Sequence, residues 1–448
     1  MGANHASAAR LPGPAQRSLH AFSAALILGL LAVALAAVVY RFPPPAPAFL
    51  VLGGVGTIGV LCLAVARYDA AVALGFLLFG VVKVEPAPPD LVFAAVICVA
   101  MVTGRFRLDR VPLTVGALLG LFVALNLLSM IEAVDTERAA AFMGITLYLA
   151  VFSIWFSGYL DSESRARLVV IAYLITASVS AALGLLALLG ALPGGDAFLF
   201  TGERAQGLFK DPNVFGPFMV PIALVLLEEI VQPRLIRIPR AATLLLLNTL
   251  ALAIVFSFSR AAWLNAGVAL VVLVAVLGLR RGGAVRSTAV LSIVLAAAGI
   301  ASAVVLFSGS ESFLGERAGL QTYDVQRFGA QEVGIELAEQ HPAGIGPGQF
   351  ESLSPISAHS TYVRVLAEQG VLGVVAFFGL SLATLVFALR NATLGRHTWG
   401  IGSAALLAAW CGIVANSLFV DTLHWRHLWL VAALIWVAAM RRPTVTSG

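Results

Sequence analysis

Three arginines and one histidine lie at the edges of long apolar segments or in the polar stretch between two of them, where they could bind and transform an anionic compound. Arg204 precedes one apolar segment and Arg260 opens another, while Arg327 lies in a long polar stretch that His359 nearly ends. A planar guanidinium group suits phosphate oxygens. A neutral imidazole can accept a proton from a hydroxyl group. These residue types predict a site for an anionic headgroup, such as a diphosphate, with a base beside it.

Three apolar segments begin with signals for a helix N-terminus. Asp211 before Pro212 combines a capping acceptor with a proline at the first helical position. Ser259 can cap a second helix, and either Ser357 or Ser360 can cap a third. The free N–H groups and the positive dipole end of each helix favour a phosphate. If the three starts share one side of a membrane, they strengthen the predicted anion site.

The same residues also have simpler interpretations. Arg364 and Glu368 are four residues apart on one expected helix, which favours an ion pair. The glycine-rich stretch 344–348 could present N–H groups to an anion or could be a plain turn. His359 could be an interfacial or capping residue. The other arginines could contact lipid headgroups or pair with the carboxylates of Glu203, Asp211, Asp324 or Glu368.

The composition places these residues in a membrane protein. Of 448 residues, 60% are hydrophobic and 11% are charged, whereas a soluble domain carries about 25% charged residues. The apolar runs are long and continuous, unlike the short alternating strands of a barrel. We expect an all-α polytopic protein, a single transmembrane domain over 1–448 with about 12–14 spanning helices. The fourteen runs are 21–40, 47–66, 69–84, 90–104, 111–131, 139–159, 168–191, 212–231, 241–258, 260–279, 287–307, 361–389, 399–420 and 427–440.

Arginine positions predict the orientation. Basic residues favour the cytoplasmic side of short loops, and 18 of the 28 Lys and Arg residues fall on one side if the N-terminus is inside. Both tails, 1–20 and 441–448, are then cytoplasmic, with a retained first span preferred over a cleaved signal peptide. The outer active-site loops are 191–211 and 308–360, and we expect short helices in the longer one. The 18 are Arg10, Arg17, Arg67, Arg105, Arg107, Arg110, Arg165, Arg167, Arg234, Arg237, Arg240, Arg280, Arg281, Arg286, Arg390, Arg396, Arg441 and Arg442.

Other ligands find little support in the sequence. No basic run is interleaved with aromatic residues, so we expect no nucleic acid partner. The three cysteines lie in apolar runs without paired spacing, and His424 and His427 give the nearest approach to metal-ligand spacing, so we expect no metal. A proton- or ion-coupled transporter would usually carry carboxylates near the membrane midplane, where the expected spans have mainly amides.

Four motifs in the second half resemble the O-antigen ligase / O-antigen polymerase superfamily of bacterial membrane glycosyltransferases. They are RAQGLFKDPN at 204–213, FSRAA at 258–262, Arg327 ahead of HPAGIGPGQF at 341–350, and HSTY at 359–362 running into EQGVLG at 368–373. The resemblance covers about 200–380, and the first 190 residues match only as generic spans. The family often has asparagine where this chain has Ser360.

The resemblance implies a donor glycan on undecaprenyl diphosphate, used at the outer face of the bacterial inner membrane, with no cofactor or metal and with inversion of the anomeric centre. Arg204 and Arg260, with Arg327 as a third position, would hold the diphosphate, and His359 would activate the acceptor hydroxyl. Membrane lipids surround the site, and the acceptor would be lipid A-core or another glycan. Possible supporting residues are Lys210, Asp211, Asn213, Gly346, Gly348 and Tyr362.

The sequence is compatible with three functions. A ligase would move the whole glycan to a new carrier, whereas a polymerase would add it to another lipid-linked repeat unit. Fourteen expected spans favour a polymerase slightly, and the single long loop before His359 favours a ligase slightly. A solute or anion transporter is the least favoured, because the expected spans lack carboxylates near the midplane.

Overall fold

A computed structural model describes residues 46–280, 322–354 and 356–441 of the chain. Among the described residues, those from Val55 onward form one compact unit, and 46–54 belong to a second unit. The described part is all-α apart from one small hairpin of β1 (Leu199–Phe200) and β2 (Arg204–Ala205). The expected spans 21–40 and 287–307, the tail 1–20 and the tail 441–448 beyond Arg441 lie outside the described residues.

The other twelve expected apolar runs all coincide with helices. Within the part of the chain that the structure describes, six helices are long and apolar enough to cross a membrane, namely α5 with the turn η2 that follows it, α6, α7, α8, α10 and α15. The remaining described runs form shorter apolar helices, among them 68–77 and 88–102. The helices are α2 (Ala46–Ala66), α3 (Tyr68–Leu77), α4 (Pro88–Val102), η1 (Leu108–Arg110), α5 (Leu113–Ser129), η2 (Met130–Glu132), α6 (Thr136–Tyr159), α7 (Glu163–Leu188), η3 (Gly195–Phe198), α8 (Pro212–Val231), α9 (Arg240–Phe256), α10 (Arg260–Arg280), α13 (Thr322–Gln340), α14 (Phe350–Leu353), α15 (Thr361–Thr393), α16 (Ser403–Asn416) and α17 (Arg426–Met440).

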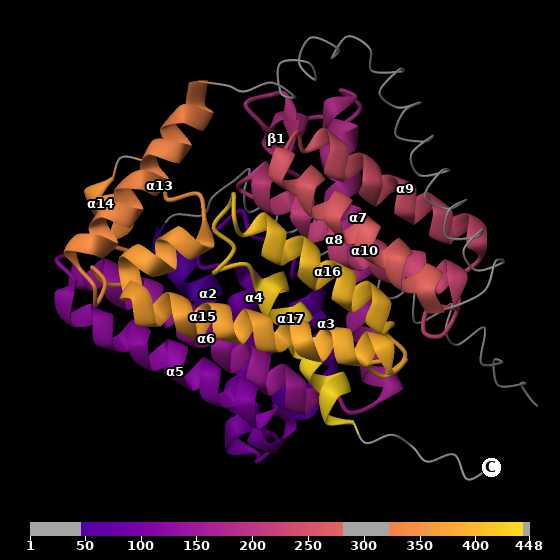
Figure 1. The fold of residues 1–448 in the computed structure, drawn as a ribbon. Coiled ribbons are helices and arrows are strands. Elements are labelled where there is room, and N and C mark those ends of the chain that lie inside the picture. Colours follow the sequence, from indigo (N-terminus) through magenta and orange to yellow (C-terminus); the bar gives the residue numbers. More distant parts are fainter. Residues whose placement is uncertain (1–45, 281–321, 355, 442–448) are drawn as a thin grey trace, which may run out of the picture. The chain divides into compact units, whose positions relative to one another are not determined.

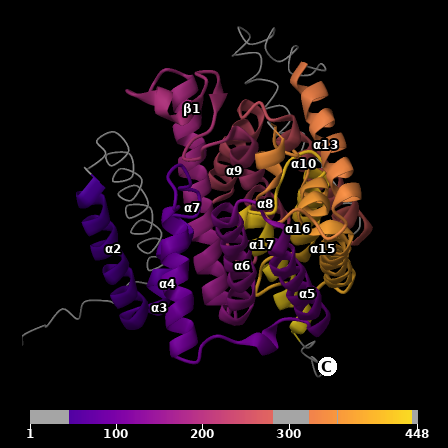
Figure 2. The ribbon, with the colours of Figure 1, turned by 90° about the vertical axis from the view of Figure 1, so that its left-hand side faces the viewer.

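Contacts between loops and helix ends identify the two ends of the helix bundle. At one end, the Glu228 carboxylate accepts from Ala405 N at 2.8 Å, and Trp399 Nε1 donates to Leu160 O at 2.9 Å. The arginine pattern places the segments that carry these four residues together on the cytoplasmic side. Figure 2 shows α6, α8, α16 and α17 running between the two ends, and each of these helices packs against at least one other of the four.

The opposite end, here called the site end, carries the motifs. There the Arg204 Nε donates to Ser257 O at 2.9 Å, and Thr361 N donates to Ser417 O at 2.9 Å. These bonds join segments that are far apart in the sequence. The alternation of the expected spans places these segments on the same side of the membrane. The starts of α8, α10 and α15 therefore meet at this end, as their capping signals predict.

The long loop before α15 contains more helix than the sequence suggested. Its described part forms the 19-residue α13 and the single turn α14, and both contact α15 (Figure 1). The helix α15 is interrupted at Gly370, where φ is 71° and ψ is −172°. A side chain at that φ would be strained, so glycine allows the break that the glycine-rich loop then occupies.

Candidate functional site

A cavity of about 260 Å³ at the site end brings together three of the predicted site residues, Arg260, Arg327 and His359. They come from the first residue of α10, the first turns of α13 and the segment just before α15. The chain thus places two guanidinium groups and one imidazole around one space. The remaining lining residues are Ala261, Leu264, Phe328, Gln331 and Phe419.

The three predicted helix caps position this cavity. The Asp211 carboxylate accepts from Asn213 N at 2.8 Å at the start of α8, and Ser259 Oγ accepts from Ala262 N at 3.2 Å at the start of α10. Ser360, rather than Ser357, caps α15. Since each cap fixes where its helix begins, the caps also fix the positions of the side chains beside them.

Two non-glycine residues beside the cavity adopt positive φ values. His359 has φ of 46°, and Phe258, two residues before Arg260, has φ of 47°. Such values are uncommon outside glycine and are unfavourable for a bulky side chain. Strained residues persist where the surrounding structure holds them, often at functional sites. The strain at His359 therefore fits a residue whose orientation is fixed by the fold.

The surroundings of His359 favour its neutral form. Burial and, after it, the positive charge of Arg327 lower the pKa of the imidazole to about 4, while the carboxylate of Asp211 acts in the opposite direction. At neutral pH the ring therefore has a free lone pair. A neutral imidazole beside an open cavity can accept a proton from a bound hydroxyl group.

Arg204 lies beside the cavity but is not among the residues that line it. Besides the bond to Ser257 O, its guanidinium group donates to Asn213 Oδ1 at 3.3 Å and stacks over Phe200. Arg204 and Asn213 thus connect the hairpin and the start of α8 to the turn that precedes Arg260. This geometry gives both residues a supporting position, and direct contact with a diphosphate stays a prediction.

Three other predicted residues have their own contacts. Lys210 Nζ lies 2.7 Å from Glu85 Oε1, and both side chains are well exposed. The Tyr362 hydroxyl donates to Val414 O at 3.3 Å and lines a separate groove between α15 and α16. None of Lys210, Asp211 and Tyr362 lines the cavity of His359.

The glycine-rich loop packs against α15 and α6. Gly346 N donates to Glu368 O at 3.0 Å, a carbonyl that lies next to the break in α15. A Cβ on Gly346 would lie 2.8 Å from Ala133, and one on Gly348 would lie 2.6 Å from the Phe142 ring. The glycines permit this close approach. Their contacts support the interpretation as a turn, and a role in anion binding stays a prediction.

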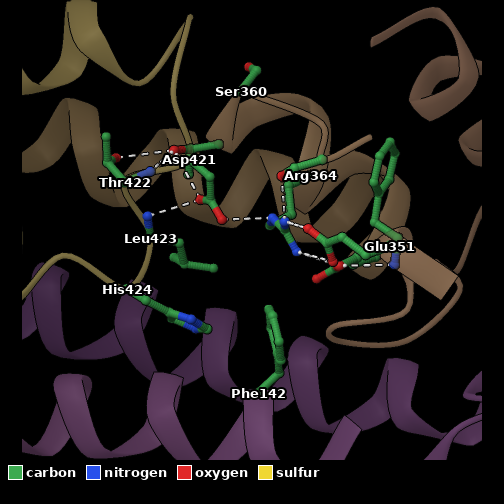
Figure 3. A network of polar contacts seen from close by, with 12 residues as sticks. Phe142, Glu351, Ser360, Arg364, Asp421, Thr422, Leu423 and His424 are labelled. Carbon is green, nitrogen blue, oxygen red and sulfur yellow. Dashed lines mark hydrogen bonds and ion pairs between the residues drawn. The ribbon is translucent and has the colours of Figure 1, made fainter. Parts of the chain in front are cut away.

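Arg364 forms the densest polar cluster at the site end (Figure 3). Its NH1 lies 3.0 Å from Glu368 Oε1, which confirms the predicted ion pair, and its Nε lies 2.7 Å from Asp421 Oδ2. Glu351 is a third carboxylate partner, with NH1 to Oε2 at 3.2 Å. The Phe142 ring lies 5.5 Å from the guanidinium carbon. Burial tends to raise the pKa of Glu351, but the hydrogen bond and charge of Arg364 hold it below its usual range.

The cluster connects the segment that carries His359 to the rest of the fold. Asp421 Oδ1 also accepts from Leu423 N at 3.1 Å, so this carboxylate joins the loop after α16 to the first turns of α15. Figure 3 shows Asp421 and Glu351 on different sides of Arg364, with Ser360 above them. The cluster therefore holds the start of α15 in place, and His359 lies two residues before that start.

Within 46–280, 322–354 and 356–441, no three His, Cys, Asp or Glu side chains gather as a metal site would require. Two guanidinium groups and one imidazole line the cavity instead.

The fold is that of a polytopic membrane protein, and a cavity lined by two arginines and one histidine lies at one end of its helices. The family model described as O-antigen ligase matches residues 244–378, a range that includes Arg260, Arg327 and His359. The match supports the O-antigen ligase superfamily, and so a membrane glycosyltransferase of O-antigen ligase or polymerase type. A search among curated proteins found no match.

Sequence reasoning missed several residues at the site end. Gln331 and Phe419 line the cavity, and Asp421 and Glu351 neutralise Arg364. None of them is in a motif that points to phosphate chemistry. One usable signal existed for Asp421: it is a lone carboxylate between two apolar runs on the side that holds Arg364.

Proposed function

We propose that the protein transfers a glycan from undecaprenyl diphosphate to a hydroxyl acceptor, without a metal ion and with inversion at the anomeric carbon. The observation that carries the proposal is the shared cavity of Arg260, Arg327 and His359, which lies within the matched family segment. The arginine distribution supports a site end that faces away from the cytoplasm, in the periplasm of a bacterial inner membrane.

Arg260 and Arg327 are proposed to bind the diphosphate. Charge-assisted hydrogen bonds from guanidinium groups are stronger than neutral ones. Arg260 is also the first residue of α10, where backbone N–H groups and the helix dipole favour an anion. These groups stabilise the negative charge that grows on the diphosphate as the glycosidic bond breaks. Arg204 is proposed to support the turn that precedes Arg260.

His359 is proposed to act as the general base. The acceptor hydroxyl gives its proton to the imidazole, and its oxygen forms a bond to the anomeric carbon. The bond from that carbon to the diphosphate oxygen breaks, and the electron pair leaves with undecaprenyl diphosphate. Attack from the face opposite the leaving group inverts the centre. Holding both substrates in one cavity supplies the orientation that such a step needs.

Donor binding is proposed to make His359 a better base. In the free protein the charge of Arg327 helps to lower the pKa of the imidazole. A bound diphosphate would compensate that charge, so the pKa of His359 would rise. The histidine would then hold a proton more readily at the stage when the acceptor hydroxyl must lose one.

The test is reconstitution of the full chain with a purified undecaprenyl-diphosphate glycan and candidate acceptors, with and without a chelator. A single transfer to a new carrier identifies a ligase, whereas a ladder on undecaprenyl diphosphate identifies a polymerase. Product anomers determined by NMR test inversion. The absence of any glycan transfer with authentic donor and acceptors would reject the proposal.

A further inference from the structure

An apolar groove between α15 and α16 lies next to the proposed site. Its volume is about 850 Å³, and its lining includes Tyr362 and Phe378 from α15 and Val414 and Leu418 from α16. Phe378 is 57% exposed and Leu418 is 50% exposed, so these large side chains are available to a ligand. The groove therefore offers a long hydrophobic surface that begins at the site end.

The groove and the cavity meet at one short segment. Leu418 lines the groove and the next residue, Phe419, lines the cavity. On the other helix, Tyr362 lines the groove three residues after His359 lines the cavity. The bond from Thr361 N to Ser417 O joins the two helices at this place (2.9 Å).

We propose that this groove holds the first isoprene units of the polyprenyl tail of the donor. The inference rests on the proposed function, since it assumes a diphosphate between Arg260 and Arg327. In such a donor the diphosphate is bonded directly to the first isoprenoid carbon. The tail must therefore enter an apolar surface immediately beside the phosphate site, and the step from Phe419 to Leu418 provides that surface.

The same chemistry argues against a lipid acceptor in this groove. The reacting hydroxyl of a glycolipid acceptor is separated from its own lipid by sugar residues, so its acyl chains have no reason to lie one residue from the phosphate site. The acyl chains of bilayer lipids are as apolar as the polyprenyl tail. Moving the tail from the bilayer into the groove therefore gains little free energy from the hydrophobic effect. Its contribution is to fit a methyl-branched chain and so to align the diphosphate.

Cys411 gives a direct probe of the groove. It lines the groove on α16, about 10 Å below Leu418 at 1.5 Å of rise per helical residue. The other two cysteines, Cys62 and Cys98, can be replaced by alanine, which leaves Cys411 as the only thiol. The full chain in phosphatidylethanolamine–phosphatidylglycerol nanodiscs is then treated with a lipid-soluble maleimide, and alkylation is followed by mass spectrometry.

Undecaprenyl diphosphate should slow alkylation of Cys411. The expected reduction in rate is about fivefold if the tail of the bound molecule fills most of the groove. Dimethylallyl diphosphate, whose tail is too short to reach Cys411, and inorganic diphosphate should not slow it. Unchanged alkylation while undecaprenyl diphosphate demonstrably occupies the cavity would overturn the groove assignment alone. If Arg260→Gln leaves undecaprenyl diphosphate binding unchanged, the proposed phosphate site fails, and the groove proposal fails with it.

A second variant gives the inference a kinetic readout. Ala415→Trp places an indole in the groove, and it should raise the KM for the undecaprenyl donor several-fold while leaving the KM for a short-tail donor unchanged. Leu245→Trp is the matched control, because Leu245 is 68% exposed on α9 and lies outside the groove. Equal KM values for the long-tail donor in wild type and Ala415→Trp would contradict the proposal.

Discussion

Arg364 and Arg260 both stand in the first turn of a helix at the site end, but their surroundings differ. Arg364 is 3% exposed and contacts the carboxylates of Glu351, Glu368 and Asp421. Arg260 lines a cavity together with Arg327 and His359. The first arrangement surrounds its arginine with protein carboxylates, whereas the second places two arginines around a space that a ligand can enter.

Arginine can have two different roles in a membrane protein. An arginine within a carboxylate cluster holds segments together, and removing it leaves buried charges without a partner. Arginines at an open cavity favour an incoming anion and can stabilise charge during a reaction. Position at a helix start does not distinguish the two uses, because both arginines have it. The distinction lies in which residues from distant parts of the chain meet each guanidinium group.

The largest expected effect comes from removing the cavity arginines. The double variant Arg260→Gln, Arg327→Gln should lower kcat/KM for glycan transfer about a hundredfold or more, since each charged hydrogen bond contributes about 1.5–3 kcal/mol. Lys210→Gln is the control, because Lys210 pairs with Glu85 on the surface, and its activity should stay within about twofold. Similar losses in the double variant and the control would remove the distinction between cavity and surface cations.

The next effect concerns stability rather than transfer. Arg364→Met should lower the free energy of unfolding by about 3–5 kcal/mol, because it leaves the buried carboxylate of Glu368 without its cationic partner. Denaturant unfolding in detergent, followed by tryptophan fluorescence, measures the change. Lys210→Met is the comparison variant and should change stability much less, because its ion pair with Glu85 is exposed. An Arg364→Met protein as stable as wild type would contradict the structural role of the cluster.

A smaller loss of stability is expected at the break in α15. Gly370→Ala should cost about 1–3 kcal/mol, because Gly370 has a φ of 71° and a Cβ there would overlap Pro342 O. Gly267→Ala is a helical glycine control with no atom near the added Cβ. It should be neutral or slightly stabilising. Equal stability of the two variants would show that the glycine-rich loop does not depend on this close approach.

The most subtle effect is on pH dependence. Only neutral His359 can accept a proton, so kcat/KM should fall as the pH drops through the pKa of His359 in the free protein, about 4. Arg327→Gln removes a positive charge that lowers this pKa. The acid limb of the profile should therefore move to higher pH, towards 6.5, the ordinary value for histidine. A limb that stays in place or moves to lower pH would contradict the coupling between Arg327 and His359.

The sequence predicted the spans and helix starts well because their causes are local. Apolar runs define most of the described helices, and Asp211, Ser259 and Ser360 act as the caps that their side chains suggested. The ion pair of Arg364 with Glu368 was also predictable, since both lie on one helix face.

The rest of the site depends on contacts between distant segments. Asp421 reaches Arg364 only because the loop after α16 meets the start of α15, and no local pattern encodes that meeting. The same is true of the cavity, in which α10, α13 and the His359 segment converge. The length of α13 was missed because its polar sequence has no apolar run to mark it.

The most direct test of the central claim is a single-turnover measurement of glycan transfer by His359→Ala, with donor binding measured on the same preparation. Donor affinity should stay within about twofold of wild type, and the transfer rate should be lower by at least about a hundredfold, as for loss of a general base. His341→Ala, at an exposed histidine of the same loop, should transfer at the wild-type rate. Undiminished transfer by His359→Ala would contradict the account.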